Sequence, residues 1–227
     1  MFTRTKEILG QHILNQLQQT RVILFGVGGV GGWCAETLVR TGVQHLTIVD
    51  FDQIALSNLN RQLGATYDAI GLPKVEEMRQ RLLSINPSAD IQAICQRYDE
   101  DTSSQFTFDN YDYVIDAIDT LDNKALLIYQ ATCSSATLFS SMGAGRKLDA
   151  TRIRTTEFWK VSGCPLARAL RNKMRKSGHM PQKKFQCVYS DEISSESGTI
   201  APIVGVFGMY LSHLLIQDII RKANEQE

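Results

Sequence analysis

The sequence predicts an α/β fold: a Rossmann-like, doubly wound and mostly parallel sheet with helices on both faces and a small C-terminal extension. A strand, a glycine loop, a helix and a second strand follow one another from residue 21 to residue 49. Short apolar runs then alternate with helical patterns. The 227 residues are enough for one sizeable core, so we expect a single domain over residues 1–227.

The predicted elements alternate along the first two thirds of the chain. Apolar residues at helical or strand spacing indicate, in order, a helix over 7–19, a strand over 22–25, a helix over 33–40, a strand over 45–49, a helix over 74–84, strands over 91–94 and 113–118, a helix over 124–134 and a strand over 137–140. After Gly145 the pattern weakens. It indicates a strand over 152–156, a basic segment around 158–198 and a C-terminal helix around 203–222.

Composition narrows the class of protein. Lys and Arg total 24, as do Asp and Glu, so the overall charge indicates no particular partner. The five cysteines are widely spaced and form no Cys-x-x-Cys pair, which favours reduced thiols over structural zinc. The first 19 residues are polar and amphipathic, and no segment is expected to reach the length of a membrane span. These features predict a cytoplasmic protein.

The glycine loop RVILFGVGGVGGW matches a nucleotide-binding fingerprint. Gly26, Gly28 and Gly31 have the Gly-x-Gly-x-x-Gly spacing, with Gly29 between them, and such loops bring backbone amides to a phosphate at a helix N-terminus. Asp50 ends the second strand, where a carboxylate accepts hydrogen bonds from ribose hydroxyls. Asp52 follows in the same predicted site. An NAD-binding protein fits these features equally well.

The residues after Asp50 favour a triphosphate. DFDQIALSNLNRQ brings Asn58 and Arg61 to the site, and GLPKVE adds Lys74. Adenylyl transfer needs cations that stabilise charge on the α-phosphate and the departing pyrophosphate. Asp119, in VIDAIDTLDNK, follows a strand that ends beside the loop, where a carboxylate is placed to hold Mg²⁺.

Each of these residues also has an ordinary structural explanation. Asn58 is suited to cap a turn, Arg61 and Lys74 to be solvated charges, and Asp119 to start a helix. Their occurrence in this order after a Rossmann loop favours the nucleotide site.

This set of motifs resembles the ubiquitin-activating-like adenylyltransferases, which include the bacterial enzymes that activate sulfur-carrier proteins of thiamine and molybdopterin synthesis. The resemblance implies that ATP and Mg²⁺ are used to adenylate a carboxylate. It implies that residues 26–31 cradle phosphate, Asp50 binds ribose, and Asp119 holds Mg²⁺. The phosphate contacts that it implies are Asn58, Arg61 and Lys74.

Downstream segments are similar to one branch, the tRNA threonylcarbamoyladenosine dehydratase family. They are SMGAGRKLD at 141–149, VSGCPLARALR at 161–171 and CVYSDE at 187–192, together with the opening FTRTKEILG. The resemblance implies ATP-dependent dehydration of N6-threonylcarbamoyladenosine in tRNA to its cyclic form. The threonyl carboxylate would be adenylated, and the side chain would then close into a ring.

The same resemblance implies several partners. It implies a homodimer in which Arg4 reaches the partner's ATP site, so that the catalytic set is Arg4, Arg61, Lys74 and Asp119. It also implies a cysteine desulfurase system as a partner, and it leaves a monovalent cation, Na⁺ or K⁺, open near the C-terminal segment. Gly32 departs from the family pattern, since many relatives have serine there.

A basic segment supports an RNA partner independently. Residues 160–184 hold eight Lys or Arg and no Asp or Glu. Pro165 is placed to start a helix with an apolar stripe of Leu166, Leu170 and Met174. The predicted RNA-binding residues on its other face are Arg168, Arg171, Arg175 and Lys176. Phe158, Trp159 and Tyr189 are suited either to stack on an unpaired base or to fill the core.

Two other functions share these motifs. An enzyme that activates the C-terminus of a ubiquitin-like sulfur carrier would use the same nucleotide site, and Cys164 or Cys187 would then be a thioester-forming residue or a buried structural thiol. Many such enzymes have paired Cys-x-x-Cys motifs, which this sequence lacks. A protein that binds NAD would leave Arg61, Lys74 and Asp119 without a shared role.

Overall fold

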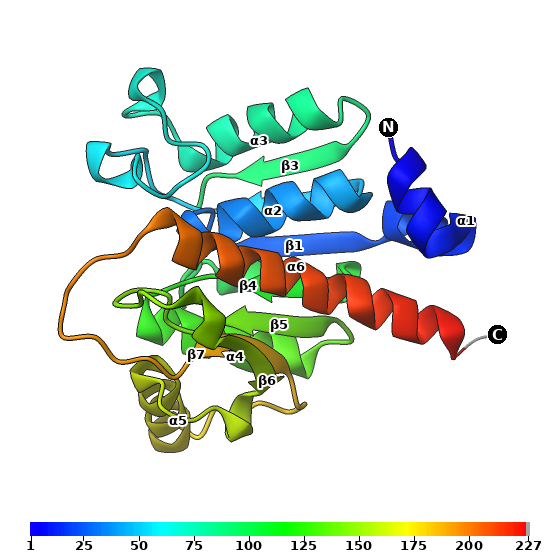
Figure 1. Ribbon diagram of the computed structural model, residues 1–227. Helices are drawn as coiled ribbons and strands as arrows, with labels where there is room; N and C mark the ends of the chain where they lie inside the picture. The colour runs from blue at the N-terminus through cyan, green and yellow to red at the C-terminus, as the bar shows by residue number, and fades with distance from the viewer. Residues whose placement is uncertain (226–227) are drawn as a thin grey trace.

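A seven-stranded sheet forms the centre of the computed structural model, which describes residues 1–225 (Figure 1). Its strands lie in the order β3-β2-β1-β4-β5-β7-β6, and all neighbours are parallel except β6 and β7. The strands are β1 Arg21–Phe25, β2 His45–Val49, β3 Asp90–Ile94, β4 Tyr113–Asp116, β5 Thr137–Ser141, β6 Ile153–Glu157 and β7 Gln186–Ser190. The expected doubly wound, mostly parallel sheet is confirmed.

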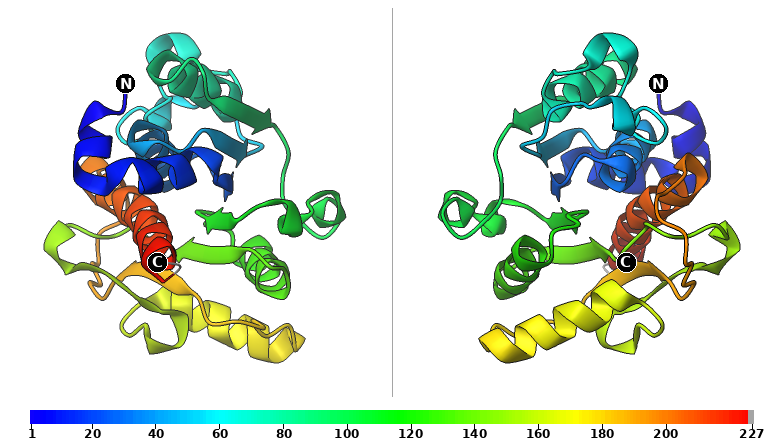
Figure 2. Two further views of the ribbon diagram at one scale, coloured as in Figure 1. Left: turned by 90° about the vertical axis from the view of Figure 1, so that its right-hand side faces the viewer. Right: turned by 90° about the vertical axis from the view of Figure 1, so that its left-hand side faces the viewer.

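Helices cover both faces of this sheet. They are α1 Thr3–Gln19, α2 Gly29–Thr41, α3 Lys74–Ile85, α4 Leu121–Cys133, α5 Pro165–Ser177 and α6 Ala201–Asn224. Figure 2 shows α4 and α5 on one side of the sheet and α1, α2 and α6 on the other. α3 packs on the same face as α2.

The two faces have separate hydrophobic cores because the central strands are buried on both sides. Along β1, Val22 and Leu24 pack under α2 and α6, whereas Ile23 and Phe25 pack toward α4 and the aromatic cluster around it. Strands buried in this way have continuous apolar sequences, which is why the run VILF indicated a strand without alternation.

Several boundaries differ from those expected. α2 begins at Gly29 rather than residue 33, because its first turn contains three glycines that give no side-chain periodicity. β4 ends at Asp116 rather than residue 118, where the Asp116 side chain accepts a hydrogen bond from the N–H of Ile118 and the chain turns away. β7 was not predicted as a strand; its five residues include Cys187 to Ser190, which are buried.

The longest helix corrects another expectation. α6 has an 18-residue window with a mean hydropathy of 1.6, so by length and composition it is capable of crossing a membrane. The expectation that no segment approaches that length was wrong. Half of this window is buried inside the fold, where Gly208 lies against the backbone of α2. Such burial is typical of a core helix.

The sheet changes its winding direction between β1 and β4. From β1 the chain continues outward to β2 and β3, and from β4 it continues the other way to β5 and β7. In open α/β sheets, ligands bind beyond the carboxyl ends of the strands at such a switch point. The glycine loop after β1 and the loop after β4 meet there.

Candidate active site

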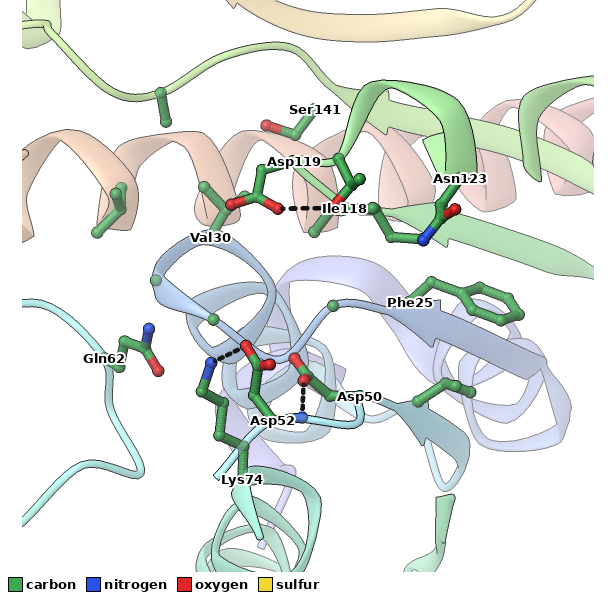
Figure 3. A pocket seen from close by; sticks show the side chains of 18 of the residues that line it. Phe25, Val30, Asp50, Asp52, Gln62, Lys74, Ile118, Asp119, Asn123 and Ser141 are labelled. Carbon is green, nitrogen blue, oxygen red and sulfur yellow. Dashed lines mark hydrogen bonds and ion pairs between the residues drawn. The ribbon is translucent and has the colours of Figure 1, made fainter. Parts of the chain in front are cut away.

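A cavity of about 290 Å³ lies at the carboxyl ends of the central strands (Figure 3). The glycine loop, the segment after β2, the start of α3 and the loop after β4 form its walls. The predicted site residues that line it are Gly26, Gly28, Gly29, Asp50, Asp52, Arg61, Lys74 and Asp119. These eight residues come from segments up to 93 positions apart in the sequence, and the fold brings them to one cavity.

Close packing explains the glycines of the loop. Gly26 has φ of 88°, and a Cβ there would lie 2.7 Å from the carbonyl oxygen of Ala117. A Cβ on Gly31 would lie 1.8 Å from the carbonyl oxygen of Gly26, so Gly31 serves the packing of α2 against the loop rather than the cavity. Gly28 precedes the first turn of α2 and lines the cavity. The free amides of that helix N-terminus favour an anion.

Asp50 ties the glycine loop to the segment after β2. One carboxylate oxygen accepts the N–H of Val27 at 2.7 Å, and the other accepts the N–H of Asp52 at 2.9 Å. Burial raises the pKa of Asp50 above its usual value, and these two N–H groups and nearby Lys74 oppose that rise. The carboxylate is thereby fixed at the end of β2, where a ribose hydroxyl would meet it.

Two cations reach the cavity from different elements. Lys74, the first residue of α3, is 8% exposed, and its Nζ lies 2.6 Å from Oδ2 of Asp52. The guanidinium of Arg61 donates to the carbonyl oxygen of Ser57 at 2.7 Å and to the side chain of Asn60 at 2.9 Å. Hydrogen bonds hold both side chains in place, so both charges are pre-oriented.

Asp119 faces the cavity from the opposite wall. Figure 3 shows its carboxylate on one side of the glycine loop and the Asp52–Lys74 pair on the other. Within residues 1–225 no cluster of three His, Cys, Asp or Glu side chains is suited to hold a metal. Mg²⁺ is commonly held by one or two carboxylates together with phosphate oxygens, so a single exposed carboxylate beside a phosphate site fits it.

Besides Gly31, two residues predicted for the nucleotide site lie outside the cavity. Asn58 is buried in a short turn, Leu56–Asn58, where its Oδ1 accepts the N–H of Ala55 at 3.0 Å. This is the turn-capping alternative considered for it. Arg4 is on α1, which precedes the amino end of β1, whereas the cavity lies at the carboxyl end (Figure 1). Its side chain is 93% exposed and pairs with Glu7 at 2.7 Å.

The cavity also contains residues that the sequence analysis did not identify. Gln62, Phe51 and Arg97 line it, and the Arg97 guanidinium lies 4.0 Å from the centre of the Phe51 ring. Ser141 lines it at the end of β5. Arg97 and Ser141 follow or end predicted parallel strands, and that position was the signal available for finding them.

The basic helix α5 is partly as expected. Arg168, Arg175 and Lys176 are exposed, but Arg171 turns inward and donates to the carbonyl oxygens of Phe158 and Val161. The expectation that Arg171 projects from the exposed face was therefore wrong, because two backbone carbonyls of the preceding turn attract it. The buried stripe of α5 is Ala167, Leu170 and Met174, and Leu166 lines the cavity instead.

Burial also distinguishes between the alternative roles of the aromatic residues and of the cysteines. Phe158 and Tyr189 are core residues, whereas Trp159 is 37% exposed with the Arg175 guanidinium 6.0 Å above its ring. Cys164 and Cys187 are both buried, and burial raises the pKa of Cys187 to about 12. A thiol of that pKa is protonated at neutral pH, which favours the structural explanation for Cys187.

Comparison with known proteins identifies related chains. The family model described as the ThiF family matches residues 3–227. A tRNA threonylcarbamoyladenosine dehydratase of Bacillus subtilis is 39% identical over 191 residues, covering 84% of this chain and 74% of that protein. Its Escherichia coli counterpart is 35% identical over 196 residues, covering 84% and 73%. Molybdopterin-synthase adenylyltransferases match at lower identity.

A solved structure matches the entire fold. The crystal structure of the E. coli tRNA N6-threonylcarbamoyladenosine dehydratase in complex with ATP aligns with a TM-score of 0.93 and 31% identity. The alignment covers 100% of this chain and 96% of that chain.

Proposed function

The chain belongs to the ThiF family, and from that membership we propose that it is an ATP-dependent enzyme that converts N6-threonylcarbamoyladenosine in tRNA to its cyclic form by dehydration. One observation carries the proposal. The cavity brings the glycine loop, Asp50, Arg61, Lys74 and Asp119 together. The fold matches, along the whole chain, that of a dehydratase whose structure was solved in complex with ATP.

The first step is adenylation of the threonyl carboxylate. A carboxylate oxygen attacks the α-phosphorus of ATP, the bond to the β-phosphate oxygen breaks, and pyrophosphate leaves. Negative charge then grows on the α-phosphate and on the leaving group. We assign the stabilisation of that charge to the N-terminus of α2, Lys74 and Arg61, and the hydrogen bonds that fix both side chains support this assignment.

The second step closes the ring. A nucleophilic atom of the same modified side chain attacks the acyl carbon of the adenylate and gives up its proton to solvent, and AMP leaves with the former carboxylate oxygen. The net change in the nucleoside is the loss of one water. The nucleophile and electrophile belong to one side chain, so their effective molarity is high and no enzyme thiol is needed. This agrees with the burial of Cys164 and Cys187.

Mg²⁺ supplies charge neutralisation and alignment of the phosphates when it is bound. Asp119 is the residue of this chain that would hold it. Lys74 and Asp52 form the opposite wall of the cavity. The ammonium group of Lys74 offsets the negative charge of the Asp52 carboxylate on that wall.

The proposal extends to the partners of the enzyme. The tRNA would lie across α5, where Arg168, Arg175 and Lys176 are exposed and Leu166 from the same helix reaches the cavity. We propose a cytoplasmic homodimer in which Arg4 acts on the partner's ATP. A cysteine desulfurase partner and a monovalent cation, Na⁺ or K⁺, stay predictions of the resemblance.

The test is a direct assay of the modified nucleoside. The purified protein is incubated with Mg·ATP and tRNA carrying N6-threonylcarbamoyladenosine, and the nucleoside is followed by mass spectrometry under conditions that preserve a labile ring. Loss of one water that depends on ATP is the expected result. ATP binding without any mass change would instead favour a sulfur-carrier protein as the substrate, and NAD binding tighter than Mg·ATP would overturn the adenylyltransferase class.

Replacing Lys74 or Asp119 by alanine tests the assigned roles. Each variant is expected to lower kcat by a factor of roughly 10² or more, since each removes a charge that acts on the phosphates. Circular dichroism should show an intact fold, because Lys74 is the first residue of α3 and Asp119 lies in the loop between β4 and α4. Turnover equal to wild type in either variant would contradict the role assigned to that residue.

A further inference from the structure

A buried ion pair lies directly beneath the loop that carries Asp119. Asp116 ends β4 and Lys124 is in the first turns of α4; both are 0% exposed, and Nζ lies 2.8 Å from Oδ2. Taking two charges out of water costs several kcal/mol per ion, and such a pair rarely stabilises a core more than apolar residues would. Stability alone therefore does not explain why a lysine occupies this position.

The ion pair forms hydrogen bonds with both the N–H and the carbonyl group of one loop residue, Ile118. Oδ1 of Asp116 accepts the N–H of Ile118 at 3.1 Å, and Nζ of Lys124 donates to the carbonyl oxygen of Ile118 at 2.9 Å. Ser140, on the neighbouring strand β5, donates its hydroxyl to Asp116 at 2.6 Å. The residue that follows Ile118 is Asp119, which lines the cavity.

The glycine loop holds the residue before Ile118. The N–H of Ala117 donates to the carbonyl oxygen of Phe25 at 2.8 Å, and Gly26 packs so closely that a Cβ there would lie 2.7 Å from the Ala117 carbonyl oxygen. Ala117 is thus fixed to β1 and Ile118 is fixed to the ion pair. Because these two residues directly precede Asp119, they determine the position of the Asp119 backbone.

We propose that the Asp116–Lys124 ion pair is a positioning device, which fixes the peptide between Ile118 and Asp119 and so sets the Asp119 carboxylate relative to the glycine loop. Lys124 is a positioning residue rather than a catalytic one, because it is fully buried and its Nζ is engaged by Asp116 and Ile118. The inference rests on the proposed function, since it assumes that Asp119 holds Mg²⁺ against the ATP phosphates.

The experiment compares ATP binding with and without Mg²⁺ in Lys124→Met, by calorimetry, alongside kcat and KM for ATP. Affinity for ATP without the metal should stay within about twofold of wild type, because the glycine loop and Asp50 are unchanged. The Mg²⁺ concentration for half-maximal binding should rise about 10- to 100-fold, the usual effect of losing a residue that orients a metal ligand. In turnover, kcat should fall more than KM rises.

Two further variants keep the test decisive if Lys124→Met does not fold. Ser140→Ala removes one hydrogen bond to Asp116 and leaves both charges in place. Asp116→Asn combined with Lys124→Met removes both charges, so no lone ion is left in the core. Both should raise the Mg²⁺ requirement, with the smaller effect in Ser140→Ala.

Glu36→Gln is the matched control. Glu36 is another buried carboxylate, 6% exposed and paired with Arg40 and Arg81, but it lies on α2 away from the cavity. It should lower Tm without changing the Mg²⁺ requirement. A folded Lys124→Met or Ser140→Ala protein with a wild-type Mg²⁺ requirement and kcat would overturn the positioning role. A wild-type protein that binds no Mg·ATP would overturn the proposed function instead, and the wild-type titration is performed first.

Discussion

Two adjacent glycines at the start of α2 have opposite surroundings. A Cβ on Gly31 would lie 1.8 Å from a backbone carbonyl oxygen. Apart from its chain neighbours and the backbone of its own helix, the nearest described atom to a Cβ on Gly32 is 3.9 Å away. Backbone atoms cannot move aside as the end of a flexible side chain can, so packing allows only glycine at position 31. Gly32 is not constrained in this way, so the packing leaves room for a small side chain at that position.

Replacing each glycine by alanine gives a matched prediction. Gly31→Ala should lower the free energy of unfolding by about 1–3 kcal/mol or more and weaken ATP binding, because the loop must shift. Gly32→Ala should raise the free energy of unfolding by up to about 1 kcal/mol, since alanine is the better helix former. Thermal unfolding and calorimetry measure both effects, and equal Tm values for the two variants would contradict the difference in packing.

The carboxylate of Glu36 predicts a pH dependence. Burial acts to raise the pKa of Glu36, but hydrogen bonds from Arg81 and Arg40 outweigh it and hold the pKa below its usual value. A lowered pKa stabilises the fold at pH values above the unfolded pKa of about 4.3, and that stabilisation is lost as the pH falls through the folded value. Glu36→Gln should therefore cost about 1–3 kcal/mol at neutral pH. Urea unfolding should show this difference shrinking below about pH 4; a constant difference would contradict the linkage.

Residues differed in how far the sequence revealed them. Gly26 and Asp50 were identified because their chemistry follows from spacing around one loop. Lys124 was not, because its partner Asp116 lies on β4 whereas Lys124 lies on α4, and no periodicity within one element connects residues of two elements. Arg171 was assigned to the wrong side of α5 because the carbonyl groups that attract it belong to a different segment.

At the scale of elements, α5 is a cationic surface joined to the cavity. Its exposed cations are Arg168, Arg175 and Lys176, whereas Lys173 is paired with Asp122 at 2.8 Å. Its inward side is apolar, and Leu166 at its first turn lines the nucleotide cavity. A polyanion lying along this helix would thus extend toward the adenylation site.

Charge reversal on α5 tests this arrangement. Changing Arg168, Arg175 and Lys176 to glutamate should weaken tRNA binding and reduce the slope of log affinity against log salt by about 0.7–0.9 for each RNA phosphate that the variant no longer neutralises. Fluorescence anisotropy across a range of KCl concentrations measures both. Arg171→Ala is the control, expected to lower stability while leaving the salt slope unchanged. An unchanged slope in the triple variant would place the RNA elsewhere.

Helices and strands were predictable where the pattern of apolar residues within the segment was itself sufficient to indicate them. β2 was predicted at its observed bounds, His45–Val49, because four of its residues are buried and polar segments flank it. β7 was missed because its five residues follow a long basic stretch, and only its pairing with β5 and β6 makes it a strand. The first turn of α2 was missed because glycines have no side chains to show a period.

At the scale of the whole molecule, Arg4 and the cavity lie at opposite ends of the sheet. Within one chain Arg4 therefore cannot act on the ATP bound at its own glycine loop without large rearrangement. An action of Arg4 in catalysis requires a second copy of the chain, whose cavity faces the α1 of the first.

Mixing two inactive variants tests this requirement. Arg4→Ala and Lys74→Ala should each be inactive alone. After subunit exchange in equal amounts, half of the dimers are mixed, and each mixed dimer has one site with both residues intact, so about one quarter of wild-type activity should return. Turnover measured before and after exchange provides the readout. No recovery, with exchange verified by mass spectrometry, would contradict action between subunits.

The packing of α6 on the glycine loop has a consequence for biosynthesis. A Cβ on Gly29 would lie 3.1 Å from Val204, and Gly208 lies against the backbone of Val30, so the loop is packed against a helix that begins to contact it 175 positions later in the chain. At about 5–20 residues per second, a ribosome needs about 10–35 seconds to synthesise the intervening chain. During this interval the nascent phosphate loop lacks its support, and nucleotide binding should be acquired only after α6 has left the exit tunnel.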